Sequence, residues 1–210
     1  MLVTGIKSKP IYSPLRADPR GRFHIMLGLG VGEVAILRVL RELEASDAKA
    51  LGATRVLLVP AAPADGAAGA TLASQREIEA LPLQEVRTFA DVASILAELR
   101  STLTDSFMGT RLYLAGPESF IGLAMKIALE FNLNKDEVRA EELGSLARRV
   151  YCIHCRVAIE NVRTNIVRCE TCDRWLLVRD HYSRRLAAYM GVMVDAEAPG
   201  ELPPIKEVFV

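Results

Sequence analysis

The chain has 210 residues, half of them hydrophobic, and its 26 basic side chains are balanced by 26 acidic ones. This length is enough for one well-packed core and a small additional module, and the balanced charge argues against a nucleic-acid-binding protein. No uncharged apolar run reaches the roughly 18 to 20 residues that cross a bilayer, and the first twenty residues lack the apolar block of a secretory signal. We therefore expect a cytoplasmic protein without a membrane partner.

Residues 1–21 are predicted to form an extended N-terminal arm. They contain Pro10, Pro14 and Pro19 among charged side chains. Proline withholds the backbone donor that helices and sheets use, so regular structure is expected to begin only near Phe23.

Residues 22–145 are predicted to form an α/β domain. Three apolar runs have the length and composition of strands, at residues 23–29, 55–59 and 111–115. Three further segments carry apolar side chains at helical spacing, at residues 33–44, 88–103 and 118–131. Residues 60–70 are rich in Ala, Gly and Pro and are expected to form an exposed, mobile loop. Alternating strands and helices indicate a small parallel sheet covered on both faces.

All four cysteines lie in two Cys-x-x-Cys pairs, Cys152 with Cys155 and Cys169 with Cys172, and thirteen residues separate the pairs. Two residues between cysteines allow a tight turn to direct both sulfurs at one ion, and two such turns complete a tetrahedron. This clustering favours one metal site over two disulfides. Because four thiolates leave no open coordination position, we predict structural Zn²⁺ in a zinc ribbon over residues 146–180.

A single iron is the alternative metal, since four thiolates also hold iron in rubredoxin-like electron carriers. Arg156 and Asp173 stand after the two pairs, where a glycine often helps backbone amides turn toward sulfur. Their presence favours zinc. His154 lies inside the first pair and is expected to face solvent, because four cysteines already complete the site.

A glycine-rich turn, Gly28-Leu-Gly30-Val-Gly32, is predicted to connect the first strand with the first helix. Backbone amides and the helix dipole can receive a phosphate at such a place. The alternative is a tight turn whose glycines allow the helix to pack closely. Glu33 favours this alternative, because a carboxylate at the start of a helix repels a phosphate.

A second turn, Ala115-Gly116-Pro117, follows the strand at residues 111–115. Together the two turns resemble the pyridine-nucleotide half of ferredoxin reductases, including the phthalate dioxygenase reductase type, where a glycine-rich turn and a Cys-Gly-Pro turn flank the nicotinamide. Two departures weaken the match: Ala115 replaces the family's cysteine, and Glu33 and Val34 stand in place of its Thr-Pro.

The resemblance implies a reductase-like domain without catalysis of its own, and no catalytic residue is assigned. It implies that NADPH, if bound, is contacted through the backbone of Gly28, Gly30, Gly32, Gly116 and Pro117.

Residues 181–210 are predicted to form a helix, at about residues 183–189, and an extended tail that docks on a partner. The segment is rich in arginine, tyrosine and methionine, which suit interface cores. His181 beside Asp180 has no nucleophile at motif spacing, so we do not assign it a catalytic role.

The α/β half, the sequence RRVYCIHC and the later LVRDHYSRRLAAYMGVMVDAEAPGE resemble the DmmA family, the small accessory subunit of bacterial dimethylamine monooxygenase, or heme-dependent oxidative N-demethylase. The resemblance implies a zinc-containing, non-catalytic subunit of a hetero-oligomer. Its partners would be a heme-binding catalytic subunit and a reductase subunit that carries FMN and an iron-sulfur cluster. Together they would demethylate dimethylamine with NADPH and O₂. Two alternatives remain open: a single-iron electron carrier and a stand-alone zinc-ribbon adaptor.

Overall fold

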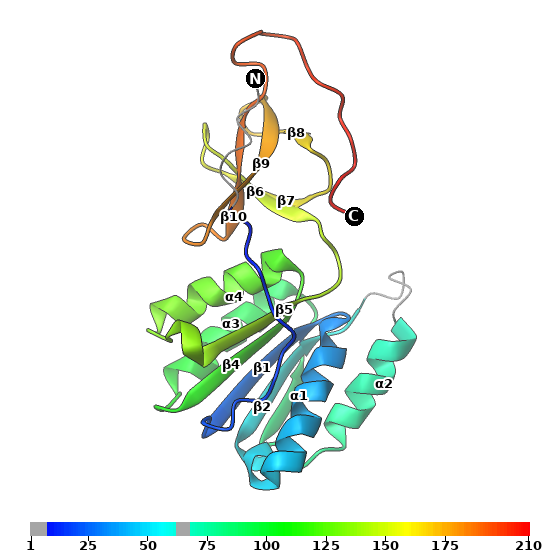
Figure 1. Cartoon of the computed structure of the whole chain (residues 1–210), viewed down its shortest axis with the longest axis vertical. Coiled ribbons are helices and arrows are strands. Elements are labelled where there is room, and N and C mark those ends of the chain that lie inside the picture. The colour runs from blue at the N-terminus through cyan, green and yellow to red at the C-terminus, as the bar shows by residue number, and fades with distance from the viewer. Residues whose placement is uncertain (1–7, 62–67) are drawn as a thin grey trace. The chain divides into compact units, whose positions relative to one another are not determined.

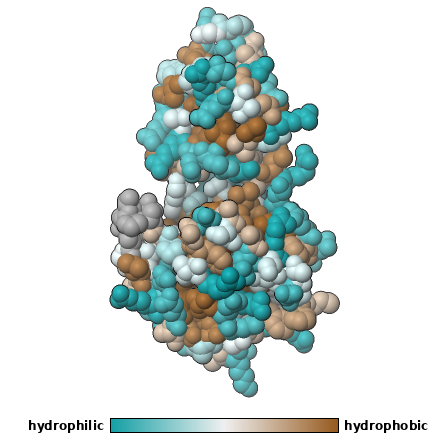
Figure 2. All heavy atoms as spheres, turned by 180° about the vertical axis from the view of Figure 1, so that it is seen from behind, coloured by the Kyte–Doolittle hydropathy of each residue, from teal (hydrophilic) through white to brown (hydrophobic). Residues whose placement is uncertain are grey.

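The computed structural model describes residues 8–61 and 68–210. Contacts divide this part of the chain into two compact units, Tyr12–Gly144 and Ser145–Val210, and the described residues up to Ile11 belong with the second. None of the helices in the described ranges is long and apolar enough to cross a membrane. On the face drawn in Figure 2, polar and apolar side chains are interspersed over each unit.

The first unit is an α/β domain built on a parallel sheet, as predicted, and this sheet has five strands (Figure 1). The strands are β1 (Phe23–Leu29), β2 (Thr54–Val59), β3 (Glu85–Thr88), β4 (Thr110–Gly116) and β5 (Val138–Glu142). Their order across the sheet is β3-β2-β1-β4-β5, and every neighbouring pair is parallel. The three central strands are apolar almost throughout, because both of their faces are buried.

Helices cover both faces of this sheet (Figure 1). They are α1 (Gly32–Ser46), α2 (Ala68–Glu79), α3 (Val92–Thr104) and α4 (Glu118–Glu130), with short 3₁₀ turns at Ala48–Ala53 and Lys135–Glu137. One buried cluster joins α1 and α2 to the sheet around Met26 and Tyr113, and the other joins α3 and α4 around Leu27 and Leu114. Successive residues of one strand therefore pack into the two clusters on opposite faces of the sheet.

The structure confirms the three predicted strands and three predicted helices and adds elements that the sequence pattern did not reveal. The edge strands β3 and β5 are only partly buried and carry charged residues, so they lack a strand-like apolar pattern. The helix α2 begins at Ala68, so the last three residues of the segment 60–70, which was expected to be a loop, are helical instead. Residues 62–67 of the expected loop lie outside the described residues.

The predicted arm is extended, but its described part is not a separate segment. Leu15 and Asp18 are each 1% exposed, and both are held by the α/β unit. The backbone N–H of Leu15 donates to Glu141 at 2.6 Å, and that of Asp18 donates to the Tyr113 hydroxyl at 3.0 Å. The chain between Pro14 and Pro19 makes these contacts through its backbone N–H groups, which a reading based on proline alone could not anticipate.

The second unit is a mixed five-stranded sheet that carries the four cysteines. Its strands are β6 (Arg148–Cys152), β7 (Ala158–Val162), β8 (Ile166–Arg168), β9 (Trp175–Ser183) and β10 (Ala188–Met193). Their order is β7-β6-β10-β9-β8, with β10 parallel to β6 and antiparallel to β9.

The prediction of a helix at residues 183–189 is wrong, because β9 and β10 form a hairpin there. Tyr182 and Tyr189 face each other across the hairpin with ring centroids 5.0 Å apart, and both rings are buried. This cross-strand packing outweighs the helical preference of the local sequence. Since β10 lies at the centre of the sheet, the ribbon continues past the expected boundary at residue 180, through Met193.

Candidate metal centre and the two glycine turns

The two cysteine pairs converge on one point, as their spacing predicts. The four sulfurs all lie within 4.8 Å of one another, with Cys152 Sγ 3.7 Å from Cys172 Sγ and Cys155 Sγ 3.5 Å from Cys169 Sγ. Metal–sulfur bonds of about 2.3 Å in a tetrahedron give sulfur–sulfur edges of about 3.8 Å. The thiols are therefore arranged to bind one metal ion, and they are too far apart to form disulfides.

The two knuckles have the same backbone hydrogen bonds. The N–H of the first cysteine in each pair donates at 2.9 Å to the carbonyl five residues later, that of Val157 or of Arg174. The carbonyl of the same cysteine accepts from the residue four positions later, Arg156 at 2.9 Å or Asp173 at 2.8 Å. The two halves of the site are thus one local structure used twice.

Arg156 and Asp173 adopt the left-handed backbone conformation that glycine usually supplies, with φ of 64° and 61°. The sequence argument treated the missing glycines as evidence against a rubredoxin-like iron site. In the structure both knuckles turn as they would with glycine, so these residues do not distinguish zinc from iron.

Backbone amides also reach the sulfurs. Burial acts to raise the pKa of Cys172, but hydrogen bonds from the backbone and side chain of Arg174 outweigh it and lower that pKa to about 6. Burial raises the pKa of Cys155 to about 12, against a hydrogen bond from the Val157 backbone. Metals bind the thiolate form, which Arg174 therefore favours at Cys172. His154 is exposed, as predicted.

The two glycine turns meet at the carboxyl ends of β1 and β4. These neighbouring strands form the topological switch point of the sheet, where open α/β sheets bind ligands. A Cβ atom on Gly32 would lie 2.2 Å from the Ala115 carbonyl oxygen, and one on Gly116 would lie 3.0 Å from Leu29 Cβ. The structure thus brings the predicted residues together, with Pro117 as the N-cap of α4.

The glycines of these turns are explained by packing. A Cβ atom on Gly28 would meet Leu58 at 3.0 Å, while Gly30 and Gly116 have positive φ, 56° and 155°. Gly32 lies against the turn after β4. The tight-turn alternative accounts for all four.

Three backbone amides of the first turn are already bonded to carbonyls. The N–H of Gly30 donates to Val59 O at 2.8 Å, that of Glu33 to Gly30 O at 3.1 Å, and that of Val34 to Val31 O at 3.3 Å. A phosphate on the N-terminus of α1 would have to displace them.

Acidic side chains lie at the starts of both helices that follow the glycine turns. Glu33 is fully buried in the first turn of α1, and neither of its carboxyl oxygens has a hydrogen-bond partner among residues 8–61 and 68–210. Burial, followed by the charge of Glu79, raises the pKa of Glu33 to about 7. Glu118 is buried in the first turn of α4, and Glu141 ion-pairs with Arg38. With these acidic side chains in place, the N-terminus of α1 does not fit the pyrophosphate of a dinucleotide.

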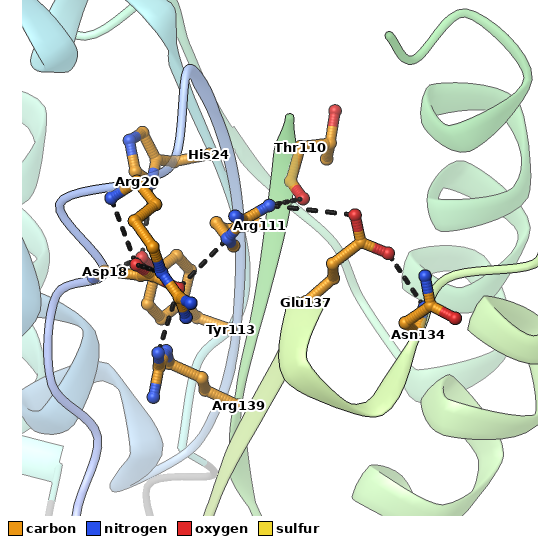
Figure 3. A network of polar contacts seen from close by, with 9 residues as sticks. All are labelled: Asp18, Arg20, His24, Thr110, Arg111, Tyr113, Asn134, Glu137 and Arg139. Carbon is orange, nitrogen blue, oxygen red and sulfur yellow. Dashed lines mark hydrogen bonds and ion pairs between the residues drawn. The ribbon is translucent and has the colours of Figure 1, made fainter. Parts of the chain in front are cut away.

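A polar network at the opposite ends of the strands was missed by the sequence reading (Figure 3). The buried carboxylate of Asp18 accepts hydrogen bonds from Arg20 at 3.0 Å, Arg139 at 2.9 Å and Arg111 at 3.0 Å. These bonds hold the pKa of Asp18 far below its usual range, and the bond from Arg20 has the largest effect. Arg111 and Arg139 are each the second residue of a strand. Charged side chains at the starts of two strands are the sequence feature that could have indicated this network. The network fastens the arm to the sheet.

Two family models match the chain. The N-terminal domain of dimethylamine monooxygenase subunit DmmA-like proteins matches residues 4–138, and the C-terminal domain matches residues 149–192. The heme-dependent oxidative N-demethylase delta subunit of Ectopseudomonas mendocina (strain ymp) is 35% identical over 111 residues, which cover 53% of this chain and 63% of that protein. The match thus spans less than two thirds of the relative.

Two solved structures resemble the α/β part at low similarity. The ferredoxin reductase in carbazole 1,9a-dioxygenase has a TM-score of 0.42 and 15% identity over 60% of this chain and 34% of that one. Amycolatopsis cytochrome P450 reductase GcoB has a TM-score of 0.41 and 14% identity over 60% and 38%.

Proposed function

The chain belongs to the DmmA-like family of dimethylamine monooxygenase subunits, and from this premise we propose that it is a zinc-binding, non-catalytic accessory subunit of a multicomponent monooxygenase. The complex would oxidatively demethylate dimethylamine with NADPH and O₂. The observation that carries the proposal is the cluster of four cysteine sulfurs within 4.8 Å of one another, which together close the coordination sphere of one metal ion.

Zinc in this site would act structurally. Four thiolates leave no position for water or substrate, so the ion cannot serve as a Lewis acid. The apolar core of the ribbon is small, with Val150, Val162, Val178, Tyr182 and Tyr189 as its buried members. A core of this size needs an additional link, which a metal supplies by joining the β6–β7 and β8–β9 hairpins.

The partners in this proposal are a heme-binding catalytic subunit and a reductase subunit with FMN and an iron-sulfur cluster. The name of the delta subunit relative supports an assembly of several chains. In this proposal a partner subunit binds the phosphates of NADPH, and the two glycine turns only contact the rest of the molecule. The residues of these turns are Gly28, Gly30, Gly32, Gly116 and Pro117.

A single-iron electron carrier is the second candidate function. It is favoured by the partial exposure of Cys155 and Cys172, and the left-handed Arg156 and Asp173 do not argue against it. Electrons could then pass between reductase and heme through this chain. A stand-alone zinc-ribbon adaptor is the third candidate, and the balanced charge of the chain disfavours it.

Native mass spectrometry with elemental analysis separates the three candidates. The protein is purified together with the products of its neighbouring genes, and metals and attached chains are counted in one preparation. We expect one zinc per chain and attached heme and flavin subunits. One iron would support the electron carrier instead, and a lone zinc-loaded chain would support the adaptor.

A further inference from the structure

Glu33 occupies the place where an α/β domain would ordinarily receive a phosphate. It lies in the first turn of α1, a helix of 15 residues, directly after the glycine turn. Its side chain is fully buried, and in the described part of the chain neither carboxyl oxygen has a hydrogen-bond partner. Burying an unpaired carboxylate is costly, so a core position without a specific role would normally hold an apolar residue. The chain retains an acid here.

The two turns beside Glu33 add negative charge and contain no cationic side chain. Neither turn, at residues 28–34 or 115–119, contains a lysine or an arginine. The second turn contributes another buried acid, Glu118, at the start of α4. Arg38, farther along α1, is already paired with Glu141. A phosphate at this edge would meet like charges in a medium of low dielectric constant, where repulsion is stronger than in water.

Three backbone amides at this turn are not available to offset this repulsion. The amides of Gly30, Glu33 and Val34 donate to carbonyls of the turn or of β2. The helix dipole remains, but its favourable effect on an anion is smaller than the repulsion from one buried carboxylate nearby.

We infer that Glu33 sets the ligand specificity at the carboxyl ends of β1 and β4 by excluding phosphate from the N-terminus of α1. The isolated chain therefore does not hold NADPH. In the assembly, a point that rests on the proposed function, the phosphates of NADPH are bound by cationic groups of a partner subunit, and the two glycine turns contact only uncharged parts of the molecule.

Titration of the full-length, metal-loaded chain with NADPH at pH 8, followed by nicotinamide fluorescence, tests this inference. The wild type should show no saturation up to about 1 mM. Glu33→Gln removes the charge and keeps the shape, and we expect it to bind NADPH at least tenfold more tightly, a difference of about 1.4 kcal/mol. Pyrophosphate should compete for the site gained, whereas free nicotinamide should not.

Glu44→Gln is the matched control, because it removes the same charge from the exposed far end of the same helix. It should bind NADPH no better than the wild type. Micromolar binding by the wild type, or equal weak binding by Glu33→Gln and Glu44→Gln, would overturn the inference. The thermal unfolding temperature of each variant confirms that it is folded.

Failure of this inference and failure of the proposed function are separable. Phosphate exclusion is measured on the isolated chain, whereas membership of the complex is measured by copurification. A chain that copurifies with heme and flavin subunits and also binds NADPH alone refutes only the inference. A chain that excludes NADPH and never associates with those subunits refutes the proposed function and leaves phosphate exclusion by the isolated chain standing.

Discussion

The guanidinium of Arg148, in β6, lies 3.8 Å from the ring centroid of Phe209, the penultimate residue of the chain. The centroid of the Tyr189 ring lies 4.0 Å from the same guanidinium, and Asp180 accepts a hydrogen bond from Arg148 Nη2 at 2.7 Å. The backbone around Asn165 also pairs with the tail. The C-terminal tail is therefore a packed part of the ribbon.

Phe209→Ala should destabilise the ribbon by about 1 to 2 kcal/mol, through loss of the cation–π contact and of buried apolar area. Urea denaturation followed by the fluorescence of Trp175, the one tryptophan of the chain, measures this. Val208→Ala is the control, since Val208 is 47% exposed and its loss should cost less than about 0.5 kcal/mol. Equal effects of the two substitutions would show that the contact between Arg148 and Phe209 contributes nothing to stability.

Removal of the metal should unfold the ribbon and spare the α/β unit. Cys152→Ser, or a strong chelator, takes away a ligand or the ion that joins the two hairpins. Trp175 emission should then shift to longer wavelength, while circular dichroism at 222 nm changes little, because α1 to α4 all belong to the other unit. Unchanged Trp175 emission after complete metal loss would contradict a structural role.

Glu33 should make the folded state less stable as the pH rises. Its pKa is raised to about 7 in the folded chain from its ordinary value of 4.5, so the folded state binds more protons between these values. Stability therefore falls with rising pH across this window, by about 1 to 3 kcal/mol. Relative to wild type, Glu33→Gln should gain stability from pH 4.5 to 7 and show a constant difference above about pH 8. Denaturation of both proteins at several pH values measures the difference, and a pH-independent difference would refute it.

Asp18→Asn should have the opposite pH dependence. Hydrogen bonds from three arginines hold the pKa of Asp18 well below its usual range, so its contribution is present above about pH 4 and is lost as the pH falls. At pH 7 we expect a loss of about 3 kcal/mol, because removal of the anion leaves the partly buried Arg111 and Arg139 without a counter-charge. Arg20→Ala, at a side chain that is 67% exposed, should cost less than about 1 kcal/mol. Thermal or urea unfolding distinguishes them, and equal losses would argue against a buried network.

Gly32→Ala should destabilise the α/β unit because its methyl group would lie 2.2 Å from the Ala115 carbonyl oxygen. Moving helix or strand backbone to relieve this clash should cost about 3 kcal/mol or more. Gly52→Ala is the control, since a methyl group there would meet nothing within 4 Å. Circular dichroism during thermal unfolding measures both variants, and similar melting temperatures would show that Gly32 is not required for packing.

Local patterns in the sequence were sufficient for the metal centre and the centre of the sheet. Spacing alone brings Cys152 together with Cys155, and Cys169 with Cys172, because a two-residue separation defines one tight turn. The runs at residues 23–29 and 111–115 are apolar because both of their faces are buried. The glycines at positions 32 and 116 also indicated two turns, and the structure places those turns against each other.

Only the tertiary structure decided features that depend on distant partners. Tyr182 and Tyr189 are buried against each other and against residues of β6, which replaces a helix with a hairpin. Asp18 lies in a proline-rich segment whose pattern gives no sign of its arginine partners, one of them 121 residues away. Periodicity and spacing report what a segment can form by itself. The burial of Glu33 and the pairing of Asp18 depend on which other segments the fold packs around them, and this information is not local.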